Sequence, residues 1–188
     1  MIRCLACIVL VAVLVSEAGA DAELTPEEVC KLTTCREAGI AQVLLDQHRY
    51  LEIPLAGTVI AHEANISIFP GEDHLIEAEL IDGQIANLRP LIGEANKPTI
   101  EVSFSQEVDD EGTVQSLLKV TNPFEFPLRY EAHIATEASE GFQYTSSCPV
   151  QPGLVAYEHW PYSVIHIVMT EVRLLHEDDV EAGVVTCH

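Results

Sequence analysis

The sequence predicts a mostly β protein built as a single antiparallel β-sandwich. From Tyr50 onward, apolar and polar residues alternate with a period of two, in short segments. Turn-forming residues separate these segments at intervals of about ten residues, a spacing typical of sandwiches. No helical segments alternate with the strands, and a hydrophobic fraction of 48% supplies enough apolar side chains for one core.

The clearest predicted strand runs from Thr99 to Val108. Its apolar residues Ile100, Val102 and Phe104 fall on one face, and polar residues fall on the other. This alternation is typical of a strand with one face on the core and the other in water. The same reasoning predicts further strands at residues 38–45, 58–62, 66–69, 75–81, 85–88, 114–120, 128–134, 141–148 and 163–175.

Two of these predictions depend on local signals. Asp82 and Gly83 lie between two apolar segments and predict a tight β-hairpin, because this dipeptide tolerates the positive φ angles of such turns. Residues 38–45 also fit a helical face through Ile40, Val43 and Leu44, but the strand interpretation is preferred because a turn signal follows at once.

The succession of short strands resembles an immunoglobulin-like or fibronectin-like sandwich in architecture. The single tryptophan and the cysteines do not have the spacing of the buried tryptophan and inter-sheet cysteine pair of true immunoglobulin domains. The resemblance therefore implies a fold and no function.

The first twenty residues have the pattern of a cleavable signal peptide. Arg3 precedes an apolar run from Cys4 to Val15, and the small residues Ala18 to Ala20 form an A-x-A cleavage site. The run is shorter than the roughly 20 residues that a spanning helix needs, so no stable membrane anchor is expected. The prediction is a signal peptide at residues 1–20, a single sandwich domain at residues 21–188, and a location in the periplasm or outside the cell.

A short helix is expected to open the mature chain. Thr25 has the character of an N-cap, Pro26 stands at the first helical position, and Glu28 completes a capping box.

Removal of the signal peptide leaves four cysteines, Cys30, Cys35, Cys148 and Cys187. An even number of cysteines in an oxidising compartment predicts disulfides, and four cysteines allow three pairings. We expect Cys30 to pair with Cys35 and Cys148 with Cys187. The second bridge would attach the C-terminal segment to the sheet.

The formal net charge of −21 excludes one class of partner. Nucleic-acid binding requires clustered lysine and arginine, and the nine basic residues are scattered singly. Anionic membrane surfaces are disfavoured for the same reason. The charge itself is typical of a well-solvated surface and attracts cations or basic partners.

No complete catalytic or metal-binding motif is present. The eight histidines form no H-E-x-x-H pattern, and no serine-nucleophile, nucleotide-binding or dinucleotide-binding motif occurs. Residues 107–118 imitate the start of a calcium loop, but Leu118 stands where a bidentate glutamate is required. Ser146 or Ser147 could act as a nucleophile only with a base from a distant position, such as His133 or His159. Serines beside a predicted disulfide cysteine are more often ordinary strand residues, so this pairing is not the preferred interpretation. No enzyme activity, cofactor or metal is expected.

The aromatic segment Tyr157–Tyr162 is the candidate contact surface. It contains Tyr157, His159, Trp160 and Tyr162, and such rings serve both cores and recognition surfaces. We expect Trp160 to pack in the core and a neighbouring tyrosine to be exposed. The functional prediction is an exported, non-enzymatic module that acts through protein or glycan contacts. The alternative is a metal-handling protein that uses histidines and carboxylates converging from separate strands.

Overall fold

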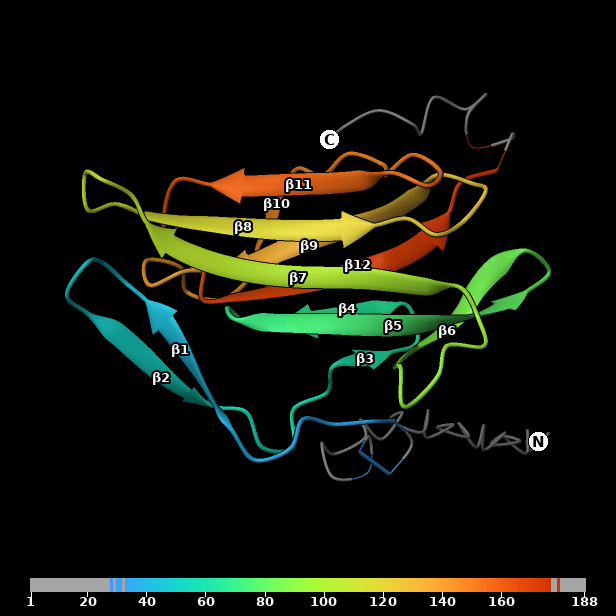
Figure 1. The fold of residues 1–188 in the computed structure, drawn as a ribbon, viewed down its shortest axis with the longest axis horizontal. Coiled ribbons are helices and arrows are strands. Elements are labelled where there is room, and N and C mark those ends of the chain that lie inside the picture. Colours follow the sequence, from blue (N-terminus) through green and yellow to red (C-terminus); the bar gives the residue numbers. More distant parts are fainter. Residues whose placement is uncertain (1–27, 29, 32, 177–178, 180–188) are drawn as a thin grey trace, which may run out of the picture.

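The computed structural model describes residues 28, 30, 31, 33–176 and 179. Within them the chain forms two five-stranded antiparallel sheets that pack face to face, and a separate two-stranded hairpin (Figure 1). The strands are β1 (Ile40–Leu44), β2 (Tyr50–Pro54), β3 (Ala61–His62), β4 (Asn65–Ile68), β5 (Glu72–Ile81), β6 (Gln84–Pro90), β7 (Thr99–Val108), β8 (Val114–Thr121), β9 (Leu128–Ala135), β10 (Gln143–Thr145), β11 (Val155–Trp160) and β12 (His166–Leu174).

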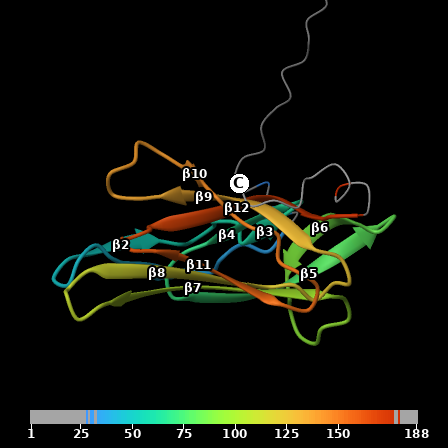
Figure 2. The same ribbon diagram turned by 90° about the horizontal axis from the view of Figure 1, so that it is seen from above.

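The two layers of the sandwich are clear when the molecule is turned (Figure 2). The front sheet has the order β11-β8-β7-β5-β6, and the back sheet has the order β10-β9-β12-β4-β3. The short edge strand β10 of the back sheet and the edge strand β11 of the front sheet are bridged by a side-chain hydrogen bond, so these two edges lie on the same side of the sandwich.

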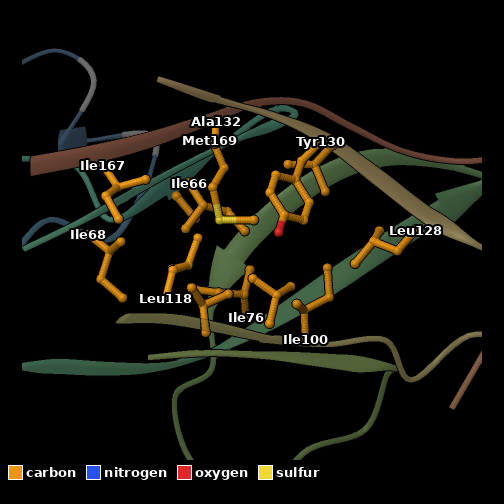
Figure 3. Close-up of a cluster of buried hydrophobic side chains, with 14 of the residues drawn as sticks. Ile66, Ile68, Ile76, Ile100, Leu118, Leu128, Tyr130, Ala132, Ile167 and Met169 are labelled. Carbon is orange, nitrogen blue, oxygen red and sulfur yellow. The ribbon is translucent and has the colours of Figure 1, made fainter. Parts of the chain in front are cut away.

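The core lies between the sheets and is filled by alternate residues of both (Figure 3). Ile66, Tyr130 and Met169 contribute from the back sheet, and Ile76 and Leu118 face them from the front sheet. All five are fully buried. The prediction of an antiparallel β-sandwich is therefore confirmed.

Several local predictions are confirmed with it. Strand β7 has the predicted bounds, and Ile100, Val102 and Phe104 are buried. Asp82 and Gly83 connect β5 and β6 with φ angles of 51° and 79°, as the predicted hairpin turn requires. Residues 40–44 form a strand, so the preferred interpretation of that segment is correct.

Other elements differ from the prediction. The strands predicted at residues 58–62 and 141–148 shrink to the two residues of β3 and the three of β10. Strands β2 and β11 were not among the predicted strands. In β2 the burial pattern shows almost no alternation, because only Ile53 is partly buried while the rest of the strand is exposed.

The segment before β3 is held against the sandwich by a buried ion pair. Cys30 and Cys35 form the predicted disulfide, and Cys35 forms an isolated bridge with Val59. The next residue, Arg36, is only 7% exposed and forms a two-point ion pair with Glu72 at the start of β5. The corner between β4 and β5 is thereby tied to the start of the described chain.

The β1–β2 hairpin lies beside the sandwich and packs against Phe69, between β4 and β5, in a small apolar cluster formed by Ala41, Leu55 and Phe69 with Ile53 against it. The side chain of Gln106 on β7 connects the hairpin to the main body. Its oxygen accepts the amide of Leu44, and its nitrogen donates to the Val164 carbonyl. Ser163 donates its hydroxyl to the Leu44 carbonyl.

Three predictions fall wholly or largely outside the described residues: the signal peptide at residues 1–20, the helix around Thr25–Glu28, and the position of Cys187. Cys148 is disulfide-bonded. In the part of the chain that the structure describes, no helix is long and apolar enough to cross a membrane.

Candidate binding site at the open sheet edges

A cleft of about 360 Å³ lies where the edges of the two sheets meet. One wall comes from β10 and the residues after it, namely Thr145, Ser146 and Cys148. The other wall is β11, from Ala156 to Trp160. The predicted contact segment therefore lines a cleft.

Strand β11 has two different faces because its side chains alternate. Ala156, Glu158 and Trp160 are wholly or partly buried and face inward. Val155, Tyr157 and His159 are exposed, and Tyr157 is 63% exposed against 5% for Trp160. The expectation that Trp160 packs while a tyrosine next to it is exposed agrees with this burial.

Trp160 links the two edges that form the cleft. Its indole Nε1 donates a hydrogen bond to the Thr145 hydroxyl, at 3.2 Å. The ring belongs to the main core cluster. A buried tryptophan needs a partner for its N–H, and Thr145 on β10 supplies it.

Glu158 is the unusual residue of the cleft. Its Oε1 accepts a hydrogen bond from the Tyr130 hydroxyl on β9, at 2.8 Å. Burial raises the pKa of the Glu158 carboxyl, and the Tyr130 hydrogen bond only partly opposes that effect. Burial, together with the charge of Glu158, raises the pKa of Tyr130 as well. Among the described residues, no lysine, arginine or histidine forms an ion pair with Glu158.

Outside the cleft, exposed apolar side chains lie on β11, just before it and on its neighbour β8. Leu154 and Val155 are 58% and 40% exposed, and Leu117 on β8 is paired with His159 in the sheet. Tyr157 lies opposite Lys119, whose Nζ is 2.8 Å from Glu101 Oε1. We call the outward-facing Leu117, Val155 and Tyr157 the β11 patch. Tyr162, just beyond β11, is 45% exposed.

Strand β11 pairs with β8, and in the described part of the chain it has no other strand neighbour. The Leu154 carbonyl accepts the amide of Asn122, next to β8. The Leu154 carbonyl therefore faces β8. Because backbone groups alternate in direction along a strand, the N–H and C=O groups of Val155, Tyr157 and His159 point toward the free side. The front sheet therefore ends in an edge with hydrogen-bonding groups available.

A second group of ionisable residues, at the corner between β4 and β5, holds the fold. Arg36 donates to both oxygens of Glu72, and to the carbonyls of Val59 and Ser67. Burial raises the pKa of Glu72, but the nearby His74 imidazole, the Arg36 guanidinium and a backbone amide outweigh it and lower the pKa to about 2. This arrangement is a structural ion pair.

His166 and Ser67, near the same corner, have the spacing of a base and a nucleophile. His166 Nε2 lies 2.7 Å from the Ser67 hydroxyl, and its ring stacks on Phe69 at 4.0 Å. Burial and Arg36 lower the pKa of His166 to about 4, which makes it a weak base at neutral pH. No described carboxylate hydrogen-bonds to this ring, so the orienting group of a catalytic triad is not supplied there.

Two other chemical candidates have structural partners. The Ser147 hydroxyl donates to the Tyr130 carbonyl at 2.7 Å. In the loop that imitates a calcium site, Asp109 accepts the amides of Glu111 and Thr113 and the Gln115 side chain. Among the described residues, no three histidine, cysteine, aspartate or glutamate side chains come together to hold a metal.

Comparison with known proteins assigns no family: no protein-family model, curated protein or solved structure matches the chain.

Sequence reasoning identified Tyr157, His159, Trp160 and Tyr162 but missed Glu158 and Tyr130. A signal for Glu158 exists in the sequence. In a strand ending at Trp160, an acidic residue two positions earlier shares the inward face of the tryptophan. Tyr130 carries no such signal, because its position beside Glu158 depends on the packing of the two sheets.

Proposed function

We propose that this protein is an exported, non-enzymatic binding module that recognises an extended, basic segment of a partner protein along strand β11. The observation that carries the proposal is that β11 has an unpaired edge in the described structure, bordered by the exposed β11 patch. Unpaired edges are templates for an added strand, and main-chain hydrogen bonds supply affinity in such complexes.

The side chains of β11 are more typical of a strand that binds a partner than of an edge strand that only faces solvent. A solvent-facing edge is often protected by lysine or proline, and the outward residues Val155, Tyr157 and His159 of β11 include neither. Tyrosine buries a large area at a low entropic cost when a partner covers it. Free main-chain groups favour a peptide over a glycan, because an added strand satisfies them in register.

The charge distribution favours a basic partner over a second copy of the chain. Each chain has a formal net charge of −21, so two copies repel one another. Glu158 also faces inward on the edge strand, and an inward carboxylate disfavours any added strand that brings no positive charge. The same residue therefore selects against self-association and for a basic segment.

Export is part of the proposal. It is supported by the Cys30–Cys35 disulfide, which persists in oxidising compartments, and by the signal-peptide pattern of residues 1–20. The metal-handling alternative has no supporting cluster among the described residues.

A displayed library of nine-residue peptides tests the proposed function. The protein lacking residues 1–20 is expected to enrich sequences that alternate apolar and basic residues. Tyr157→Pro removes an amide on the free side and should abolish this binding. Tyr50→Ala is the matched control, since it removes a tyrosine that is 59% exposed on the separate hairpin. Equal binding by the Tyr157→Pro variant, or no enrichment of any peptide, would overturn the proposal.

A further inference from the structure

The cleft at the sheet edges contains a carboxylate without a compensating charge. Glu158 faces inward between Ala156 and Trp160, and its one hydrogen-bond donor among the described residues is the neutral hydroxyl of Tyr130. A partly buried carboxylate is unfavourable unless it is paired. The contrast with Glu72, which receives two guanidinium nitrogens, shows that this chain elsewhere supplies the expected cation.

We infer that the Glu158 cleft binds the charged end of a lysine or arginine side chain from the partner. The inference rests on the proposed function and specifies the residue that the partner must present. Glu158 lines the cleft together with the hydroxyl-bearing residues Thr145 and Ser146 and the aromatic residues Tyr157 and Trp160.

The chemistry of the cleft fits such a side chain along its whole length. The carboxylate and the two hydroxyls accept hydrogen bonds from an ammonium or a guanidinium. Ala156 and Trp160 offer apolar surface for the methylene stem. Aromatic rings also attract a cation that lies over their faces. A volume of about 360 Å³ is sufficient for one long side chain.

The register of an added strand supports the same assignment. On an antiparallel pair, residues directly opposite each other project on the same face of the sheet. A partner residue opposite Glu158 on the free side of β11 therefore projects inward, toward the cleft. A lysine or arginine at that one position reaches the carboxylate without disturbing the neighbouring pairs.

Small amino-acid derivatives test the cleft separately from the edge. The probes are Nα-acetyl-lysine-N-methylamide and Nα-acetyl-arginine-N-methylamide, which are too short to pair along β11. The neutral control is Nα-acetyl-norleucine-N-methylamide. Trp160 is the only tryptophan in the chain, so its indole N–H gives a single NMR resonance located at the cleft.

The two cationic probes are expected to shift the indole resonance in a saturable way, and the norleucine probe is not. Glu158→Gln keeps an acceptor for Tyr130 but removes the charge, and should weaken cation binding about tenfold or more. Glu107→Gln, on exposed β7 surface, removes the same charge elsewhere and should leave binding unchanged.

Equal shifts from the norleucine and lysine probes would overturn the inference, as would unchanged lysine affinity in the Glu158→Gln variant. These outcomes are distinct from failure of the proposed function. If peptides do not bind along β11 while the lysine probe binds at Glu158, the cleft is a cation site and the edge proposal is wrong. If peptides bind without a preference for a basic residue, the edge proposal stands and the cleft assignment is wrong.

Discussion

Glu72 and Glu158 are both partly buried glutamates of the front sheet, and their surroundings differ completely. Glu72 receives two hydrogen bonds from Arg36 and one from the amide of Phe69, and its pKa falls to about 2. Glu158 receives one from Tyr130, and burial raises its pKa. One carboxylate is satisfied by its own chain, and the other is not. The difference separates a group that holds the fold from a group that is available to a ligand.

The largest expected effect is at Glu72. Glu72→Gln leaves Arg36 buried without a counter-charge, and should lower the free energy of unfolding by about 3–5 kcal/mol. Urea denaturation at neutral pH measures this. The double variant Arg36→Met/Glu72→Gln should lose less than Glu72→Gln alone, because it removes the buried charge. A loss below about 1 kcal/mol in the single variant would show that this pair does not hold the corner.

Trp160 tests whether the wall of the Glu158 cleft is part of the core. Trp160→Ala should lower stability by about 3–5 kcal/mol, the range for deleting a large buried aromatic side chain. Tyr157→Ala should change it by less than about 0.5 kcal/mol, since that ring is exposed. Indole fluorescence gives an independent check, because a buried ring resists quenching by iodide. Full quenching together with an unchanged melting temperature would place Trp160 at the surface.

Acid should weaken the corner through His166. Its pKa is about 4 in the folded protein against 6.5 for the free side chain, so the unfolded chain takes up a proton first. Stability should therefore fall as the pH drops from about 6.5 to 4, by an amount on the order of 2–3 kcal/mol. Glu72, with its lowered pKa, adds a further loss as the pH falls below about 4.5.

His166→Gln isolates the first of these two losses. The variant should show a flatter dependence of unfolding free energy on pH between 6.5 and 4, with the decline below that range retained. A curve parallel to that of the unmodified protein would assign the acid sensitivity to other groups.

The smallest expected effect has the opposite sign. Burial disfavours the ionised form of Glu158, so Glu158→Gln should raise stability at neutral pH by up to about 1 kcal/mol. The gain should disappear in acid, once Glu158 is protonated in both the folded and the unfolded chain. Thermal unfolding at two pH values measures it. Destabilisation at neutral pH would mean that the Glu158 charge is compensated, and would remove the contrast with Glu72.

Much of the fold could be predicted from the sequence, but the contrast between Glu72 and Glu158 could not. Alternation in Thr99–Val108 and the Asp82–Gly83 turn are local signals, and both predictions are confirmed. The Arg36–Glu72 pair spans 36 residues and depends on how the first described segment crosses the corner. The Tyr130 hydroxyl contacts Glu158 only because the two sheets that contain β9 and β11 pack against each other. No period or spacing encodes such contacts.

The attachment of the β1–β2 hairpin through Gln106 has a dynamic consequence. The hairpin buries few apolar residues, in a cluster with Phe69 apart from the main core. Its end is joined to the sandwich by the Gln106 amide side chain, the Ser163 hydroxyl and the exposed Arg49–Glu137 ion pair. Few buried contacts are typical of segments that open locally without global unfolding. Backbone amides of β1 and β2 should therefore exchange with solvent deuterium sooner than those of β7 and β8, as one cooperative unit.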